Sequence, residues 1–265
     1  MLDTYIQALI PILVAGLLSW VYSFKKHNVN IVDSLWSIMF LLAALVYQWQ
    51  NQLESSRAVL IFSLVSLWSI RLSIHLSMRN WGHAEDRRYQ KIRHNNEPNF
   101  KFKSLYIIFG LQGILAWIIS IPLLFSLGSD VPLSWFDGVA VVLWIIGFSF
   151  EAVSDYQLVQ FKCDEANQQK VLDTGLWAVS RHPNYFGEFC IWWSFYLFSI
   201  PAGGWWTIYA PVLMSFLLLK VSGVVMLEKD ISNRRPQYRE YINSTNAFFP
   251  GPKKQQSNLM KEQKT

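Results

Sequence analysis

Charged residues are scarce in this sequence. Asp, Glu, Lys and Arg make up 15% of its 265 residues, whereas soluble domains typically carry about 25%. Cysteine is scarce as well, since Cys163 and Cys190 are the two in the chain. Their positions do not indicate a disulfide, and no Cys/His spacing is typical of a zinc site, so no metal centre is expected. The sequence also lacks an internal repeat and a soluble second domain.

Long apolar runs dominate instead. Hydrophobic residues make up 52% of the chain, and most of the runs reach the roughly 17–25 residues that a helix needs to cross a bilayer core. We therefore expect an all-α, polytopic membrane protein with one seven-helix domain over residues 1–250. A cytoplasmic segment over 228–250 and a disordered polar tail over 251–265 should complete it. The expected spans are residues 5–24, 31–49, 57–76, 104–125, 133–153, 185–200 and 205–227.

Basic residues gather on alternate connections between these runs. If the amino terminus lies outside, the inside segments hold 20 of the 23 Lys and Arg residues, which agrees with the positive-inside rule. The carboxyl terminus is then cytoplasmic, and a bacterial inner membrane is the expected location. The first run is not a cleavable signal, because its basic pair, Lys25 and Lys26, follows it. The net charge of +5 indicates a basic rim against anionic lipid rather than nucleic-acid binding.

Ionisable residues inside spans are costly and indicate function. Asp33 stands near the inner end of the second span, in "NIVDSLWSIMF". It is either a carboxylate that caps a helix start or an acid that faces the bundle interior. Arg71 and His75 lie one helical turn apart in the third span.

Glu151 and Asp155 share one helical face at the expected end of the fifth span. Two carboxylates near a helix carboxyl terminus oppose the helix dipole and repel each other, so they require partners. Those partners are either loop arginines or the ribose or amide groups of a nucleotide cofactor.

The 77–103 loop mixes charges of both signs with Trp81 and Tyr89, which indicates a folded loop. Arginine forks match phosphate oxygens, so its basic residues are candidates for holding phosphates: Arg79, Arg87, Arg88, Lys91 and Arg93.

The densest polar motif is "SRHPNYFGE", residues 180–188. Pro183 suits the first turn of a helix, whose free N–H groups would face an anion beside Arg181 and His182. The simpler interpretation is an interfacial arginine, a helix-starting proline and a packing glycine, Gly187. With Asn184 and Glu188 on one face of the same helix, we favour a binding site.

The carboxyl-terminal segment repeats this polar chemistry after the last span, in "MLEKDISNRRPQYREYINSTNAFFP". It supplies Glu228, Arg234, Arg235, Tyr238 and Tyr241. By topology, segments 79–93, 151–155, 180–188 and 228–241 should converge on one cytoplasmic mouth.

These motifs resemble a known family. "EAVSDYQL", "GLWAVSRHPNYFGEFCIWW", "VSGVVMLEK", "RPQYREYINSTNAFFP", "RNWGHAEDRRY" and "VDSLW" are similar to the steroid 5-alpha-reductase-like membrane proteins, in particular their bacterial branch. The wider superfamily includes sterol reductases and isoprenylcysteine and phospholipid methyltransferases. The resemblance covers residues 30 to 250 and implies a reductase that binds NADPH at its cytosolic mouth and takes a lipophilic enone from the bilayer.

The resemblance also implies roles for single residues. The family's dinucleotide-contacting asparagine falls on Asn184, its helix-five aspartate on Asp155, and its substrate-facing acid on Asp33. Together with the reasoning above, the expected cofactor-binding set is Arg71, Arg79, Asn80, Arg88, Tyr89, Glu151, Asp155, Arg181, His182, Asn184, Tyr185, Glu188, Arg234, Arg235 and Tyr238.

Two departures concern the catalytic residues. The steroid enzymes pair a glutamate with a tyrosine to polarise the substrate carbonyl, whereas this sequence has Asp33 and, at the tyrosine position, Trp68. Tryptophan donates a hydrogen bond but is no general acid, so His75 is the candidate replacement. The expected catalytic set is Asp33, Trp68 and His75.

Three functions remain open at the level of sequence. The first is an NADPH-dependent reductase that delivers hydride to the beta carbon of a conjugated C=C bond. The second is an S-adenosylmethionine-dependent methyltransferase, which shares the "RHPNY" block and Glu228. The third is a non-catalytic lipid-binding scaffold. For the reductase, the expected partners are a hydrophobic small molecule and membrane lipids, and the protein should be a monomer.

Overall fold

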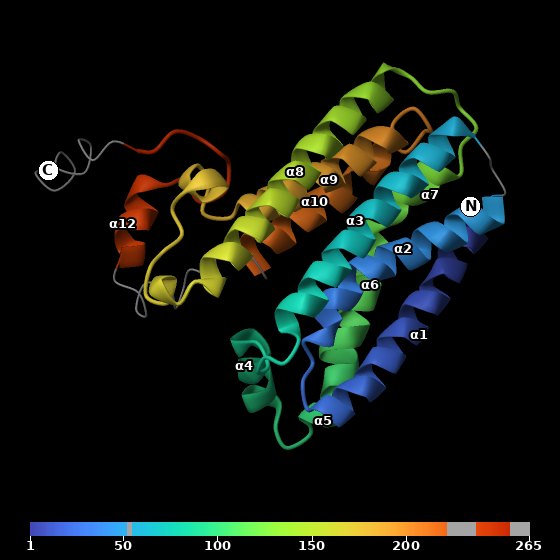
Figure 1. Cartoon of the computed structure of the whole chain (residues 1–265). Coiled ribbons are helices and arrows are strands. Elements are labelled where there is room, and N and C mark those ends of the chain that lie inside the picture. Colours follow the sequence, from blue (N-terminus) through green and yellow to red (C-terminus); the bar gives the residue numbers. More distant parts are fainter. Residues whose placement is uncertain (52–54, 222–236, 255–265) are drawn as a thin grey trace, which may run out of the picture. The chain divides into compact units, whose positions relative to one another are not determined.

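The computed structural model describes residues 1–51, 55–221 and 237–254, which form helices and loops without a β-strand (Figure 1). The chain divides into two compact units. Unit 1 comprises residues 1–136 and 198–210, and unit 2 comprises residues 137–197 and 211–265. The expected all-α class is confirmed for the described residues.

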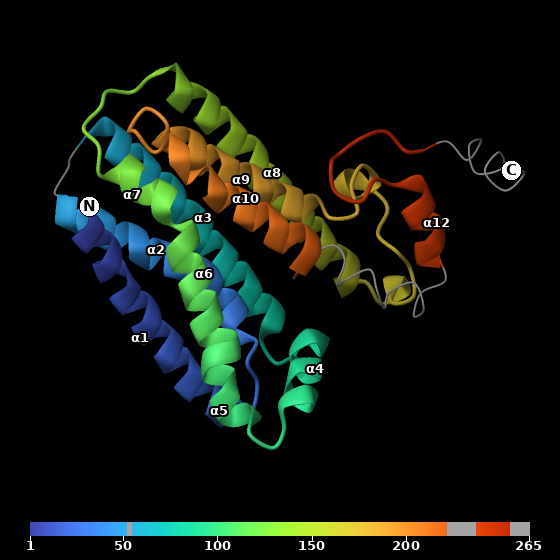
Figure 2. The same ribbon diagram turned by 180° about the vertical axis from the view of Figure 1, so that it is seen from behind.

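Three long helices open unit 1. They are α1 (Leu2–Lys26), α2 (Ile31–Asn51) and α3 (Ser56–Asn80), and α2 packs against both of the others (Figures 1 and 2). Ser55 caps α3 by accepting a hydrogen bond from the Ala58 N–H. At the start of α3, buried Arg57 donates from Nε, Nη1 and Nη2 to the carbonyls of Val131, Phe198 and Pro132, each at 3.0 Å.

The expected span over 104–125 is not one straight helix. The chain passes through α5 (Phe100–Ser104), a π-helical segment η1 (Leu105–Gly110) and α6 (Leu111–Ile119) before α7 (Ile121–Leu127). The break falls at Ser120. Pro122 stands in the first turn of α7, where its missing N–H costs little.

The charged loop before this segment is folded, as its composition predicted. It contains α4 (Arg87–Asn96), capped by Asp86, which accepts a hydrogen bond from the Arg88 N–H at 2.9 Å. Tyr89 of α4 is buried in a hydrophobic cluster that includes Val29 and Phe100. This cluster fixes α4 against the ends of α2 and α5.

Unit 2 is built around α8 (Trp135–Cys163), a helix of 29 residues. The short 3₁₀ turns η2 (Glu165–Asn167) and η3 (Gly175–Ala178) lead to α9 (Pro183–Ser199). After η4 (Trp205–Ile208), which belongs to unit 1, come α10 (Tyr209–Phe216), the π-helical η5 (Leu217–Val221) and α12 (Gln237–Ser244).

The length of α8 overturns one step of the sequence argument. The predicted fifth span ended at residue 153, but α8 continues to Cys163. Glu151 and Asp155 therefore do not lie at a helix carboxyl terminus, and the helix dipole is not the reason that they need partners. Both side chains are buried, so burial is that reason.

Two glycines bring α8 and α9 into backbone contact. An ideal Cβ built on Gly187 would stand 2.5 Å from the Gly147 carbonyl oxygen and 2.6 Å from the Glu151 nitrogen. Real Cβ contacts are not this short, so only glycine fits between the two helices. The predicted packing role of Gly187 is confirmed.

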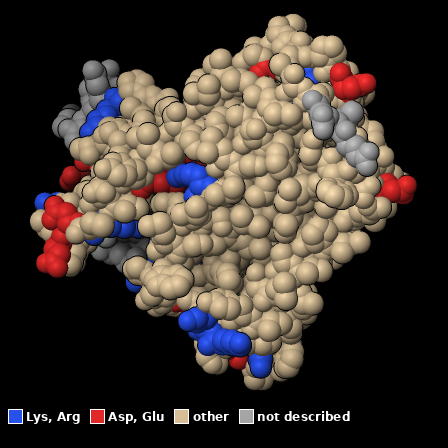
Figure 3. Space-filling model, turned by 45° about the vertical axis from the view of Figure 1, so that its right-hand side comes forward, with Lys and Arg blue, Asp and Glu red and all other residues tan. Residues whose placement is uncertain are grey.

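Several helices have the length and composition of membrane spans. Five qualify among the described residues, namely α1, α2, α3, the Phe100–Ile119 segment and α8, and the Trp205–Val221 segment is a shorter apolar helix. One face of the molecule carries few Lys, Arg, Asp and Glu side chains (Figure 3). The chain is a multi-pass membrane protein. The count of seven spans and the orientation of the termini stay predictions.

Candidate functional site

A polar cluster in unit 1 forms around Asp33, in the first turn of α2. The Tyr89 hydroxyl donates to Asp33 Oδ1 at 2.6 Å. Nη2 of Arg79 and Nη2 of Arg88 approach Asp33 Oδ2 at 3.5 and 3.4 Å. The Asp33 side chain is 13% exposed, and its partners are side chains rather than backbone N–H groups. The structure therefore favours the buried acid over the helix cap.

Asn30 holds the polypeptide around this cluster. Its buried amide accepts from the Asp86 N–H at 2.8 Å and donates to the Ala84 carbonyl at 3.3 Å. Asn80 donates to the Asn30 carbonyl oxygen at 3.4 Å. The sequence analysis missed Asn30, although a polar residue one turn before a candidate acid was a signal for it. Asn80, expected to touch a cofactor, contacts this backbone, and its cofactor role stays a prediction.

Gln112 is a second residue that the sequence did not reveal. Its Nε2 lies 3.4 Å from the Tyr89 hydroxyl oxygen. Gln112 belongs to α6, in the middle of an apolar run, where a single amide deserved the same weight as the ionisable residues. The Tyr89 hydroxyl therefore accepts a hydrogen bond from Gln112 and donates one to Asp33.

Electrostatics keep the Tyr89 proton in place. Burial and the nearby Asp33 charge raise the pKa of Tyr89 well above its ordinary value. Burial opposes the charge on Arg88, but Asp33 and Asp86 outweigh it and raise the pKa of Arg88. The cluster thus combines a protonated phenol, an oriented carboxylate and two guanidinium groups, which suits it to stabilising negative charge on a bound oxygen.

The other predicted catalytic residues belong to α3. Trp68 is fully buried in α3, and its ring packs at 5.9 Å from the Phe40 ring. Arg71 and His75 lie on α3 two turns and one turn before Arg79. The phenol that contacts Asp33 comes from α4, and the catalytic roles of Trp68 and His75 stay predictions.

A second polar cluster lies in unit 2, where α9 begins at Pro183 as predicted. The Asn184 amide donates to Asp155 Oδ1 at 3.3 Å, which joins two residues that the sequence analysis assigned to the cofactor. The rings of His182 and Tyr185 stack with centroids 5.7 Å apart. Buried Glu151 and Glu188 belong to the same helices as this pair.

Arg181 has a structural role. Its Nη1 donates to the carbonyls of Ile242 and Thr245 at 3.1 and 2.5 Å. Its backbone N–H donates to the Asn246 carbonyl at 2.9 Å. A cation at the carboxyl end of α12 is favourable, so this guanidinium holds the terminal segment, and its role as a cofactor contact stays a prediction.

Aromatic residues complete the attachment of the carboxyl-terminal segment. The Tyr241 hydroxyl donates to the Trp177 carbonyl at 2.5 Å, and the Trp177 indole donates to the Ser154 carbonyl at 3.0 Å. Tyr238 is buried, and its ring lies 5.5 Å from the Tyr241 ring. Glu228, Arg234 and Arg235 lie outside the described residues.

Each of the two clusters has its own ligand chemistry. The amide and carboxylates of unit 2 match hydroxyl and carboxamide groups, whereas Glu151 and Glu188 would repel phosphates. Arg79 and Arg88 of unit 1, with side chains 39% and 21% exposed, have the chemistry that phosphates require. Among the described residues, no group of three or more His, Cys, Asp and Glu side chains is arranged to hold a metal ion.

Comparison with known proteins gives two matches. The model of a family described as "Protein of unknown function (DUF1295)" matches residues 19–245. An uncharacterised protein of Schizosaccharomyces pombe is 27% identical over 283 residues, which cover 94% of this chain and 80% of the relative. No solved structure matches.

Proposed function

Because this chain belongs to the DUF1295 family, whose description gives no activity, we propose a function from its own residues. The protein is a membrane-embedded, NADPH-dependent reductase of a conjugated C=C bond in a lipophilic enone. The observation that carries the proposal is the Tyr89 hydroxyl at 2.6 Å from Asp33 Oδ1. A buried acid that orients a phenol at the end of a membrane helix fits polarisation of a carbonyl oxygen.

Each side chain of the unit 1 cluster has a role in this reaction. NADPH, when bound, supplies a hydride to the beta carbon, and the electron pair of the C=C bond moves toward the carbonyl oxygen. The Tyr89 O–H turns from Asp33 to that oxygen and stabilises the enolate charge. Arg79 and Arg88 offset the charge of Asp33, so the carboxylate orients the phenol without repelling the enolate. Solvent then donates a proton to the alpha carbon of the enolate.

The side chains proposed to bind NADPH contact different parts of the cofactor, according to their chemistry. Asn184 and Asp155, already hydrogen-bonded, would hold carboxamide or ribose groups. Phosphate would be held by loop cations that the Asp33 cluster does not use, Arg87 and Lys91, which are exposed, and a 2′-phosphate favours NADPH over NADH because it needs such cations. Glu151, His182, Tyr185 and Glu188 stay in the proposed binding set.

The proposal also covers the number of membrane spans, the orientation of the termini and the relationship to a characterised family. We infer seven spans with the amino terminus outside and the carboxyl terminus in the cytoplasm of a bacterial inner membrane. α9 and the Trp205–Val221 segment are the sixth and seventh spans. The quoted motifs support kinship with the steroid 5-alpha-reductase-like proteins. Tyr89, rather than Trp68 or His75, takes the role of the family's tyrosine.

Cofactor binding tests the reductase against the methyltransferase alternative. Purified protein in detergent is heated with NADPH or with S-adenosylmethionine, and unfolding temperatures are compared. NADPH should stabilise the protein, and Asn184→Ala should weaken its affinity about five- to tenfold, in line with the loss of one hydrogen bond. Stabilisation by S-adenosylmethionine alone would replace the reductase with the methyltransferase.

Turnover tests the unit 1 cluster. NADPH oxidation is followed with a panel of lipophilic enones for wild type, Asp33→Asn, Tyr89→Phe and the control Tyr106→Phe, whose ring is exposed. Loss of one hydrogen-bond donor to a developing oxyanion typically costs about 10²–10³-fold in rate, so Tyr89→Phe should lower kcat by at least about 10²-fold while NADPH binding persists. Normal turnover in Asp33→Asn or Tyr89→Phe would disprove the assigned roles.

A further inference from the structure

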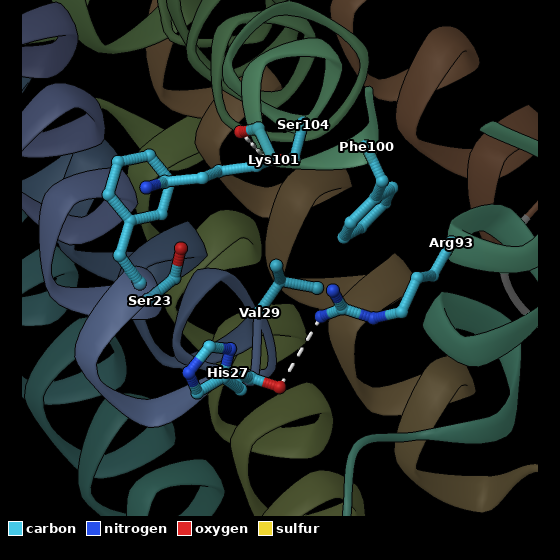
Figure 4. Close-up of a pocket in the computed structure, with 8 residues that line it drawn as sticks. Ser23, His27, Val29, Arg93, Phe100, Lys101 and Ser104 are labelled. Carbon is cyan, nitrogen blue, oxygen red and sulfur yellow. Dashed lines mark hydrogen bonds between the residues drawn. The ribbon is translucent and has the colours of Figure 1, made fainter. Parts of the chain in front are cut away.

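A small basic pocket lies in unit 1, apart from the Asp33 cluster. It has a volume of about 100 Å³ and opens between the end of α1, the connection from α1 to α2, α4 and α5 (Figure 4). Its cationic walls are Arg93 and Lys101, its floor includes Val29, and its aromatic sides are Phe24 and Phe100. Ligand pockets for drug-sized molecules measure about 300–1,000 Å³, so this pocket suits a single small group.

The two cations of the pocket are held differently. Arg93 is fixed by Glu85, which accepts from Nε at 2.8 Å and from Nη2 at 2.7 Å, and its guanidinium lies 4.2 Å from the Phe100 ring centre. The Lys101 ammonium lies 4.4 Å from the Phe24 ring centre. Within the described residues no carboxylate forms an ion pair with Lys101. The pocket therefore combines a prepositioned guanidinium with an ammonium that is available to an anion.

The surrounding chain reinforces this charge. No acidic side chain lines the pocket. Lys25 and Lys26 end α1, and Lys103 follows Lys101 on α5. The hydroxyls of Ser23 and Ser104 donate to the backbone carbonyls of Trp20 and Lys101, so recognition of a ligand depends on the two cations. Two cations favour a ligand that is an anion.

The position of the pocket indicates where the anion comes from. It lies where one candidate span, α1, ends and another, Phe100–Ile119, begins, which is a boundary between membrane and water. Tyr22, Phe102 and Tyr106 on these same elements are exposed, as expected for aromatic side chains at the headgroup level. Basic pockets between spans suit anionic lipid headgroups.

We propose that this pocket binds the phosphate of an anionic phospholipid, with Lys101 and Arg93 as its cations and the acyl chains lying beside Phe102 and Tyr106. The contact would anchor the α1–α5 end of unit 1 at the membrane surface. It is independent of the proposed reductase reaction, because it requires neither NADPH nor an enone.

Lipid retention by protein purified in neutral detergent tests the proposal. Phosphatidylglycerol, phosphatidylcholine and inorganic phosphate are titrated separately, with bound ligand counted by native mass spectrometry and the unfolding temperature recorded. We expect phosphatidylglycerol to bind more tightly than phosphatidylcholine. Because a basic residue near an anionic surface contributes about 1 kcal/mol, Lys101→Gln should weaken phosphatidylglycerol binding about fivefold.

Two further variants make the result decisive. Lys101→Arg keeps the charge and should restore binding, and Lys254→Gln removes one exposed lysine elsewhere and should change nothing. Wild-type affinity in Lys101→Gln would overturn the site. Equal Lys101-dependent binding of inorganic phosphate would overturn the lipid assignment and indicate a soluble phosphate ligand instead.

Discussion

At the scale of single residues, Tyr89 changes most between sequence and structure. The sequence placed it among basic residues as a cofactor contact, and the structure places its hydroxyl on Asp33, 56 residues earlier in the chain. A contact of that separation depends on how α4 folds back on the bundle. The sequence therefore indicated Asp33 as a candidate acid but did not reveal its contact with Tyr89.

Asp86 gives a prediction about pH. Burial opposes its charge, but the hydrogen bond and charge of Arg88 prevail and lower the pKa of Asp86. A lowered folded-state pKa contributes stability that is complete above the ordinary pKa of about 4 and is lost as pH falls through the folded value. The protection of the α4 amides, measured by hydrogen exchange and corrected for the pH dependence of the intrinsic exchange rate, should therefore fall as the pH drops below about 4.

The matched variant is Asp86→Asn, which keeps a good helix cap but cannot titrate. Its α4 should show a weaker acid dependence, and the difference should be about 1 kcal/mol or less, because the Asp86 side chain is 34% exposed and solvent screens its charge. An unchanged acid dependence in Asp86→Asn would show that another carboxylate is responsible.

At the scale of elements, the contact of α8 with α9 depends on two residues without side chains. Gly187→Ala would push a methyl group against the Gly147 carbonyl and the Glu151 backbone. Overpacking of this kind costs about 1–3 kcal/mol, and it separates the helices that carry Asp155 and Asn184. We expect a lower unfolding temperature in detergent together with weaker NADPH binding.

Gly138→Ala is the control on the same helix. A Cβ at Gly138 meets nothing within 4 Å, and alanine is the better helix former by about 0.5–1 kcal/mol. This variant should be as stable as wild type or slightly more stable. If Gly187→Ala behaved in the same way, the close approach of α8 and α9 would not contribute to stability.

The elements themselves were largely predictable, and their ends were not. Apolar runs identified α1, α2, α3 and α8, and Pro183 identified the first residue of α9. The break at Ser120 and the extension of α8 to Cys163 escaped notice. Hydropathy predicts which residues lie within the membrane. The break at Ser120 depends instead on backbone hydrogen bonds, and α8 continues as a helix through a polar stretch.

The residues of the candidate sites were also predictable only in part. Sequence reasoning selected Asp33, Asp155 and Asn184 because polar groups near apolar runs are unusual, and Asn184 does meet Asp155. It passed over Asn30 and Gln112, because within the apolar runs it weighed ionisable residues and not amides. It did not reveal the structural bonds of Arg181, because the carbonyls that Arg181 binds belong to a distant segment.

At the scale of the whole molecule, the accessibility of Cys163 to a labelling reagent tests the orientation of the protein in the membrane. Cys163 is exposed and Cys190 is buried. With the carboxyl terminus inside, a membrane-impermeant maleimide should label Cys163 in inside-out vesicles and leave it unlabelled in sealed right-side-out vesicles. Cys163→Ser combined with Asp130→Cys, an exposed position on the opposite connection, should reverse the pattern. Labelling of wild-type Cys163 from outside would invert the proposed topology.

Arg57 links this topology to the order of synthesis. The carbonyls that its guanidinium binds include that of Phe198, 141 residues later in the chain. A ribosome therefore delivers α3 to the membrane with a cation whose acceptors have not all been made. In a nascent chain that stops before residue 198, the Nη1 donor of Arg57 lacks the Phe198 carbonyl that accepts from it in the folded protein. Completion of unit 1 thus waits for synthesis to reach the end of α9.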